Sequence, residues 1–294
     1  MQPAERAAGN IYDLGYRNYE GERLGRPYAF YSLYVHTLRS AFGLGRRTSS
    51  KIMPFALAII AFIPAVIQLG IAALVPTDFD VYKAENYYSY IQTVLVLFCA
   101  AVAPELVCRD QANRTLSLYF SRSLKRRDYA LARFAGLATA LLVLTLGPQA
   151  LLFTGNVVAS SDGLGYLGDN AVDILPIVLS GVAIAVLMGS ISLAIASQSS
   201  RRAYAAVTII ALFLLAGAII EVTLNVSDGS LARNMIFLSP LHVMIGMTRW
   251  LFDVPMDGEL ALADRPRASY ALAVVVIAGL ALWVLDLRYG RIQA

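Results

Sequence analysis

Six runs of this sequence are long and apolar enough to cross a lipid bilayer as helices. A bilayer core about 30 Å thick needs roughly 20 apolar residues in a helix. The runs lie at residues 52–74, 88–108, 129–158, 174–198, 203–224 and 269–287, and no seventh run is convincing. Of the 294 residues, 58% are hydrophobic and 15% are charged, whereas soluble domains carry about 25% charged residues. The sequence therefore predicts an all-α membrane protein with six transmembrane helices.

The basic residues predict how these helices are oriented, because cytoplasmic connectors retain Lys and Arg. Nineteen of the 24 basic residues fall in the N-terminal segment, the second and fourth connectors and the C-terminal tail. We therefore expect both termini in the cytoplasm. The first apolar run begins only at residue 52, after a charged segment, so we expect no cleavable signal peptide. The predicted domains are a cytoplasmic N-terminal segment, 1–51, and a six-span domain, 52–294.

Residues 30–42 have the pattern of an amphipathic helix. Ser32, His36, Arg39 and Ser40 share a polar arc. The opposite arc is apolar and consists of Phe30, Tyr31, Tyr34, Leu38, Ala41 and Phe42. We expect this helix to lie in the cytoplasmic interface of the membrane. The alternative is a helix that packs against a partner.

The second connector, residues 109–128, mixes basic residues with apolar ones. The apolar residues are Leu116, Leu118, Tyr119, Phe120 and Leu124. A fully solvated loop does not need them, so the pattern predicts a short helix that docks on another cytoplasmic surface. Alternatively, the basic residues only orient the protein and touch anionic lipid headgroups.

The fifth connector, residues 225–268, contains a further apolar stretch at 235–252. Ser239, Pro240 and His242 interrupt it, which argues against a spanning helix. Polar backbone at membrane depth has to be sheltered by protein. We therefore expect a pair of re-entrant or interfacial helices on the outer side.

The sequence lacks the common motifs of enzyme chemistry. No Gly-Lys dipeptide occurs, which excludes the Gly-x-x-x-x-Gly-Lys-Ser/Thr phosphate loop, and no His-Glu-x-x-His zinc motif is present. Cys99 and Cys108 lie in one apolar run on opposite helix faces, as expected of packing residues. We expect no catalytic residue, no metal site and no cofactor in this chain.

Three acidic residues lie in or beside the apolar runs. We expect Glu105 to pair with Arg109 one helical turn later, and Asp286 to pair with Arg288 or Arg291. Glu221 stands alone near the outer end of the fifth run. It is a possible pathway-lining group, and an equally good alternative is that its side chain reaches the water at the membrane surface.

The order of these parts resembles the permease subunit of a type-2 ATP-binding-cassette (ABC) exporter. Residues 103–116 read APELVCRDQANRTL and residues 121–129 read SRSLKRRDY. They resemble the family's run of Pro-Glu, an acidic residue, Thr-Leu, Ser-Arg-Pro and Arg-x-x-Tyr, with Ser123 in place of the usual Pro. The N-terminal stretches IYDLGYR (11–17) and RLGR (23–26) are similar to a bacterial, actinobacterial branch.

This resemblance implies a dimer of permeases, identical or homologous, with two separate ATPase subunits that bind ATP and Mg. Residues 30–42 would form the connecting helix of such an exporter in the bacterial plasma membrane, and the second connector would hold its coupling helix. Leu116, Leu118, Tyr119 and Phe120 would then pack in a groove of the ATPase, with Arg122 and Arg126 at its rim. Glu105 would brace the base of the connector through Arg109 or Arg114.

Two other functions remain open from the sequence. An ion-driven secondary transporter would normally show internal repeats and polar groups near the bilayer midplane, and neither is evident. A non-transporting membrane scaffold would differ from a permease in that no ATPase would co-purify with it.

Overall fold

The protein is a bundle of α-helices, and six of them are long and apolar enough to span a membrane. The computed structural model describes residues 21, 24–45, 48–74, 84–121, 124–160, 163–227 and 229–291, and it contains no strand in these parts. The six long helices are α2 (Ser49–Leu74), α3 (Tyr87–Ala112), α5 (Arg126–Ala159), α6 (Gly163–Ser197), α7 (Arg202–Val226) and α11 (Arg267–Gly290). The predicted class and the six apolar runs are confirmed.

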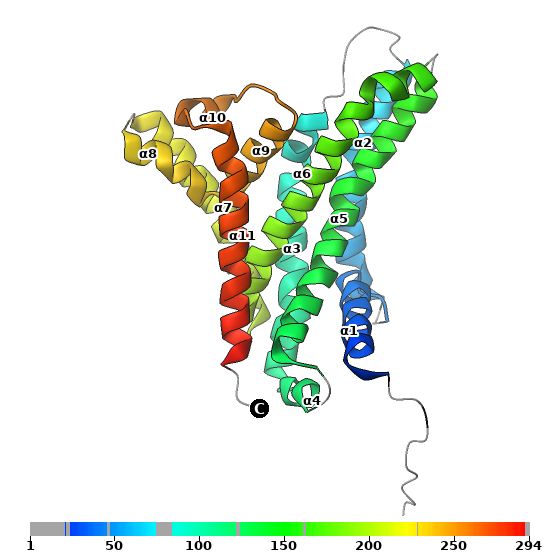
Figure 1. The fold of residues 1–294 in the computed structure, drawn as a ribbon, viewed down its shortest axis with the longest axis vertical. Coiled ribbons are helices and arrows are strands. Elements are labelled where there is room, and N and C mark those ends of the chain that lie inside the picture. The colour runs from blue at the N-terminus through cyan, green and yellow to red at the C-terminus, as the bar shows by residue number, and fades with distance from the viewer. Residues whose placement is uncertain are drawn as a thin grey trace, which may run out of the picture.

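Helices α3, α5 and α6 form the interior of the bundle, and α2, α7 and α11 surround them (Figure 1). Within an 18-residue apolar stretch of each helix, 67% of the residues are buried in α3, whereas only 17% are buried in α2 and 22% in α7 and in α11. The outer helices expose large apolar side chains such as Ile59, Val207 and Val275. A water-soluble surface rarely carries so extensive an apolar area, whereas a lipid-facing surface does.

Helix α6 begins earlier than the predicted run, at Gly163 instead of residue 174. Its first residues include Gly165, Gly168 and Asp169, which apolar length alone would not assign to a span. They are helical because they continue alongside the end of α5, where the rings of Phe153 and Tyr166 lie 6.2 Å apart. Helices of 34 and 35 residues are each about 50 Å long, more than the bilayer core requires. Their upper ends diverge from α7 and α11 in Figure 1.

Helix α1 (Gly25–Ala41) packs along α5 and α3, so a helix is present at the predicted place, but its buried and exposed faces differ from the predicted arcs. Its buried residues are Leu33, Thr37, Ser40 and Ala41. Tyr31, predicted on the apolar arc, is 60% exposed, and Ser40, predicted on the polar arc, is buried. Gly136 of α5 lies against Thr37 and leaves room for its side chain, so α1 packs on α5 through the face that carries Thr37.

The stretch at 235–252 folds as a 3₁₀ turn, η2 (Met235–Leu238), followed by α9 (Pro240–Leu251). Ser239 and Pro240, which interrupt the apolar pattern, are the start signal of α9. The Ser239 hydroxyl accepts a hydrogen bond from the His242 backbone N–H at 3.4 Å, and Pro240 occupies the first helical turn. At 12 residues α9 is about 18 Å long, too short to cross a bilayer core.

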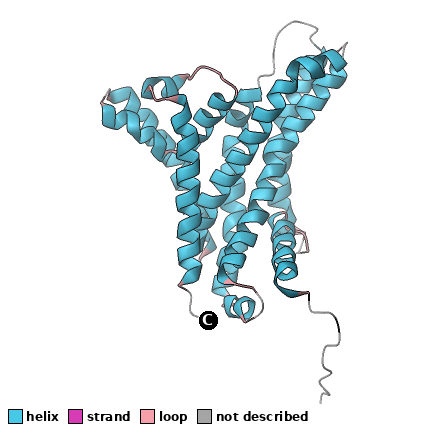
Figure 2. Ribbon diagram, in the orientation of Figure 1, coloured by secondary structure: helices cyan, strands magenta, loops and turns pink. Residues whose placement is uncertain are grey.

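Helices α8 (Ser230–Asn234), α9 and α10 (Gly258–Ala263) gather at one end of the bundle, shown at the top of Figure 1. Figure 2 shows that the described elements are all helices joined by loops and turns. A second small hydrophobic cluster joins this end to the last turns of α7 and the start of α11; it includes Ile220, Ile236, Leu260 and Tyr270. At the opposite end lies α4 (Leu116–Phe120), a five-residue helix between α3 and α5. The predicted short helix of the second connector is therefore present. A 3₁₀ turn, η1 (Ala84–Asn86), precedes α3 at the α8–α10 end.

Candidate functional site

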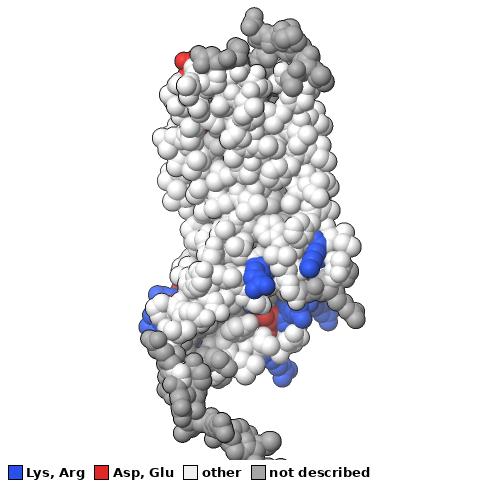
Figure 3. Space-filling model, turned by 90° about the vertical axis from the view of Figure 1, so that its right-hand side faces the viewer, with Lys and Arg blue, Asp and Glu red and all other residues white. Residues whose placement is uncertain are grey.

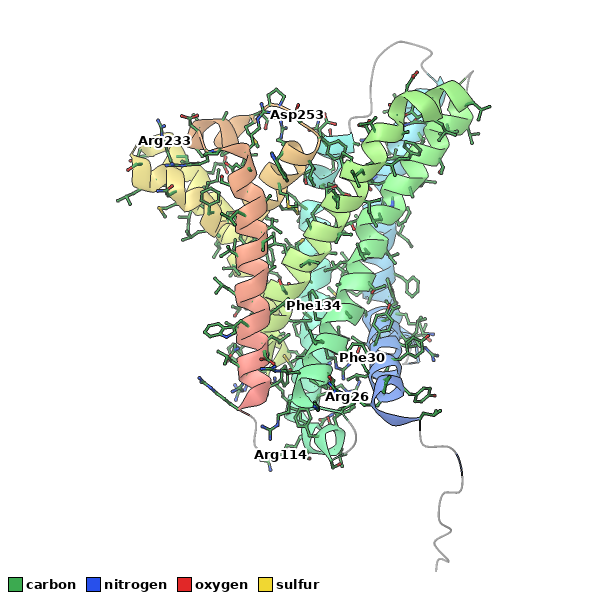
Figure 4. All side chains as sticks on the ribbon, in the orientation of Figure 1. Arg26, Phe30, Arg114, Phe134, Arg233 and Asp253 are labelled. Carbon is green, nitrogen blue, oxygen red and sulfur yellow. The ribbon has the colours of Figure 1, made fainter. Side chains whose placement is uncertain are left out.

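The strongest candidate site is the α4 end of the bundle, which also holds the start of α1. Arg26 and Arg114 mark this end in Figure 4, and Arg233 and Asp253 mark the opposite end. The chain reverses direction after α3 at Arg114, whose φ of 53° lies in the left-handed region. On the face drawn in Figure 3, Lys and Arg side chains gather towards this lower end, and the band above them is uncharged.

A buried ion pair closes the base of the α3–α4–α5 hairpin. Arg133 of α5, with only 3% of its side chain exposed, pairs with Asp110 of α3. The same Asp110 Oδ2 accepts a hydrogen bond from the Tyr129 hydroxyl at 2.7 Å. Arg133 Nη1 also donates to Thr37 Oγ1 of α1 at 3.2 Å. Since a buried charge is tolerated only when it is paired and hydrogen-bonded, these contacts tie α1, α3 and α5 together.

A second ion pair fastens the start of α1 to the start of α5. Arg26 Nε and Nη2 each donate to one carboxylate oxygen of Asp128, both at 2.6 Å. The hydrogen bonds that Arg26 donates to the Asp128 carboxylate raise the pKa of Arg26 above its usual value. Asp128 Oδ2 also accepts from the backbone N–H of Lys125 at 3.0 Å, so it caps α5 as well. This two-point contact sets the position of α1 relative to the hairpin.

The end of α6 and the end of α11 are also held at the α4 end by side chains from neighbouring helices. The Ser197 carbonyl at the end of α6 accepts from Gln111 Nε2 at 2.9 Å and from Arg288 Nε at 3.1 Å. Asp286 pairs with Arg127 of α5 at 3.1 Å, so the prediction of a local pair with Arg288 or Arg291 is wrong. A residue from another helix is a better partner because α5 and α11 meet at this point.

Glu105 forms the predicted pair with Arg109, at 3.7 Å. Its closer partner is Arg202, the first residue of α7, which the sequence did not single out. Glu105 therefore connects α3 to α7 across the fourth connector, in addition to bracing its own helix.

The apolar residues of α4 divide between the protein interior and its surface. Leu116 is buried, and the rings of Tyr119 and Phe120 lie 5.5 and 6.1 Å from the ring of Tyr129. Leu116 therefore packs within this chain, whereas Tyr119 and Phe120 are half-buried and keep part of their surface accessible. Leu118 is 67% exposed and is the large apolar side chain that α4 presents outward.

Arg126, one of the predicted rim residues, also makes contacts within the chain. Arg126 donates from Nη1 to the Gly290 carbonyl at 2.8 Å and lies over the Phe120 ring, 5.9 Å from its centroid. It is therefore engaged within the chain. Arg114 is exposed beside α4, and Arg122 lies outside the described residues.

A cavity of about 590 Å³ adjoins α4, between the start of α5 and the end of α11. Its lining combines basic and apolar side chains: Phe120, Leu124, Lys125, Arg126, Arg127, Asp286, Leu287, Gly290 and Arg291. Four basic side chains and one carboxylate, that of Asp286, give this cavity a net positive charge.

Glu221, the possible pathway residue, lies at the opposite end and lines a second cavity of about 590 Å³. This cavity lies between the start of α3, the end of α7, α9 and α10. His242 also lines it, and its Nδ1 lies 2.9 Å from Ser239 Oγ. Burial lowers the pKa of His242, and the carboxylates of Glu259 and Glu221 partly oppose that effect. The imidazole is therefore neutral at pH 7.

Arg133, Thr37 and Arg202 contribute to the α4 end although they were not predicted as site residues. One signal was present: Arg133 is a lone charge seven residues into α5, and such a charge must find a partner inside the bundle. Nothing in the sequence indicated Thr37, because its role depends on how α1 packs.

Comparison with known proteins adds no family to this picture: no protein-family model matches the chain, and no curated protein matches it in sequence.

Proposed function

We propose that this chain is the membrane-spanning permease subunit of an ATP-driven ABC exporter. In this proposal two copies, or one copy and a homologue, form the pathway in a bacterial plasma membrane with both termini in the cytoplasm. Two separate ATPase subunits bind ATP and Mg and dock at the α4 end. The chain itself carries no catalytic residue.

The observation that supports this proposal most directly is the construction of α4. It is a five-residue helix that exposes Leu118, and its base is tied by Asp110, Arg133 and Arg26 to three other helices. A rigid attachment of this kind can transmit a displacement of α4 to α1, α3 and α5 together. A loop that only orients the protein in the membrane does not need such bracing.

The charge distribution favours this function over an ion-driven transporter. The central parts of all six long helices contain no Asp, Glu, Lys or Arg, since the charged residues lie towards their ends. Ion-coupled transporters usually bind their ions near the midplane. An energy source outside the chain agrees better with such an apolar interior.

Leu118→Glu tests the docking surface. We expect the tagged wild-type chain, purified in mild detergent, to carry a subunit with a phosphate-binding loop and vanadate-sensitive ATPase activity. The substitution places a charge in the apolar contact and should reduce the co-purified activity about thirtyfold, as the loss of an anchor worth about 2 kcal/mol would.

Leu231→Glu is the matched control, because Leu231 is 81% exposed in α8, a five-residue helix at the opposite end. It should leave the co-purified activity unchanged. If the wild type brings down no ATPase, the proposed function is wrong. If Leu118→Glu retains full activity, α4 is not the docking element.

A further inference from the structure

We propose that the cavity lined by Glu221 binds an organic cation, that is, an amine or quaternary group attached to an apolar body. If the chain is the permease proposed above, this ligand is its cargo. Binding itself is a property of this chain and does not depend on an ATPase.

The size and lining of the cavity suit a small molecule. Its volume of about 590 Å³ lies within the range of about 300–1,000 Å³ typical of ligand pockets. Its polar lining includes the side chains of Asn86 at the end of η1 and of Ser89 and Gln92 in the first turns of α3. The apolar part of the lining consists of Tyr90, Leu214, Ala218, Leu241, Ile245 and Leu260. Such a wall can cover an apolar body while a few polar groups orient it.

The charges in the lining select for a cation. Arg249, the one cation of the lining, is engaged: Nη2 donates to Asp257 and Nη1 donates to the Pro255 carbonyl at 2.8 Å. Glu221 and Glu259 form no ion pair with any residue that the structure describes. With Arg249 balanced by Asp257, these two carboxylates leave the cavity negatively charged.

His242 does not compensate this charge. It lies on α9 between the carboxylates of α7 and α10, and burial keeps its imidazole neutral at pH 7. A neutral ring leaves both carboxylates free to attract a bound cation. The phenol ring of Tyr90 offers a further surface for a cation.

Glu221 and Glu259 come from different elements, which argues for a binding site instead of a chance surface charge. Glu221 lies near the end of the long helix α7, and Glu259 lies in the first turn of the short helix α10. Packing of α10 on the end of α7 brings both into one cavity. Two like charges at one cavity repel each other, and a cationic ligand would relieve that repulsion.

The test measures saturable binding of tetraphenylphosphonium to the purified full chain in neutral detergent. Tetraphenylborate, which has the same shape and the opposite charge, is the matched probe. We expect tetraphenylphosphonium to bind saturably and tetraphenylborate not to do so. Glu221→Gln and Glu259→Gln should each weaken binding about tenfold, and the double variant should weaken it further.

Two further variants test whether binding depends on the carboxylates of the cavity, on the volume of the cavity, or only on an undamaged fold. Asp253→Asn removes an exposed carboxylate at the same end of the molecule, outside the cavity, and should leave binding unchanged. Gly217→Leu keeps both carboxylates and fills the cavity wall, where an added Cβ finds the Ser239 hydroxyl and the His242 ring at ordinary contact distances of 3.8 and 3.9 Å. It should also weaken binding.

Equal binding by the double Gln variant and the wild type would overturn the inference, and so would saturable binding of tetraphenylborate. Loss of binding in Asp253→Asn would show that the carboxylates of this cavity have no special role. Because no ATPase takes part in the measurement, these results stand whether or not the proposed function holds.

Discussion

At the scale of single residues, the guanidinium of Arg133 is almost fully buried, and removing this charge from water is costly. Asp110, Tyr129 and Thr37, which come from three helices, offset part of this cost, while the buried Nε of Arg133 has no hydrogen-bond partner among the described residues. Such a group stabilises the fold only while its partners remain, since the free energy of removing a charge from water is large. The same contacts place the base of α4, so stability and the proposed docking function depend on one cluster.

We predict that Arg133→Met lowers the free energy of unfolding by about 3–5 kcal/mol, because Asp110 then keeps a largely buried charge with no cation. Combining it with Asp110→Leu should recover part of that loss. Reversible unfolding in mixed detergent micelles would measure both values. Arg39→Met, at an exposed position of α1, is the control and should change the value by less than about 0.5 kcal/mol. A variant at Arg133 as stable as this control would contradict the prediction.

At the scale of elements, the contact between α1 and α5 depends on a glycine. A Cβ atom at Gly136 would lie 2.6 Å from both Cβ and Cγ2 of Thr37. The two helices approach closely here, and this approach lets Thr37 reach Arg133. Glycines of α5 and α6 serve similar contacts elsewhere, for example Gly181 against Leu146.

Gly136→Ala should therefore destabilise the protein by about 1–3 kcal/mol, because the added methyl group forces α1 away from α5. Gly279→Ala is the matched control in another long helix, where an added Cβ meets no atom within 4 Å. It should be neutral or stabilise the protein by up to about 1 kcal/mol, since Ala favours helix over Gly. Thermal unfolding of the two variants side by side decides the matter. Equal effects would show that α1 does not pack closely on α5.

At the scale of the whole molecule, the two ends differ in their charge and in the elements they carry. The α4 end holds most of the described Lys and Arg residues and the ion pairs of Arg133 and Glu105. The α8–α10 end has ion pairs of its own, such as Arg249 with Asp257, and carries the cavity with Glu221 and Glu259. Under the positive-inside rule, the α4 end is expected to face the cytoplasm.

We predict that a cysteine at Ser117, exposed in α4, reacts with a membrane-impermeant maleimide only after the cells are opened. A cysteine at Ser230, exposed at the start of α8, should react in intact cells. The native Cys99 and Cys108 are buried and give the background signal in the parent protein. Reaction of the Ser117 variant in intact cells would reverse the proposed orientation.

The sequence predicted the local features of this protein better than its long-range contacts. Apolar runs predicted the six long helices, because a segment that must bury its backbone in lipid has to satisfy its hydrogen bonds within itself. The short helix at 116–120 and the failure of 235–252 to form a long helix followed from equally local signals.

Which side chains meet was decided by the tertiary structure. Glu105 found Arg202 in addition to its neighbour Arg109, and Asp286 found Arg127 in place of a residue on its own helix. Tyr119 and Phe120 turned inward onto Tyr129, which left Leu118 exposed. Helical periodicity shows which residues share a face, whereas the partner of that face depends on how α1, α3, α5 and α11 pack, and a single sequence carries no local record of that packing.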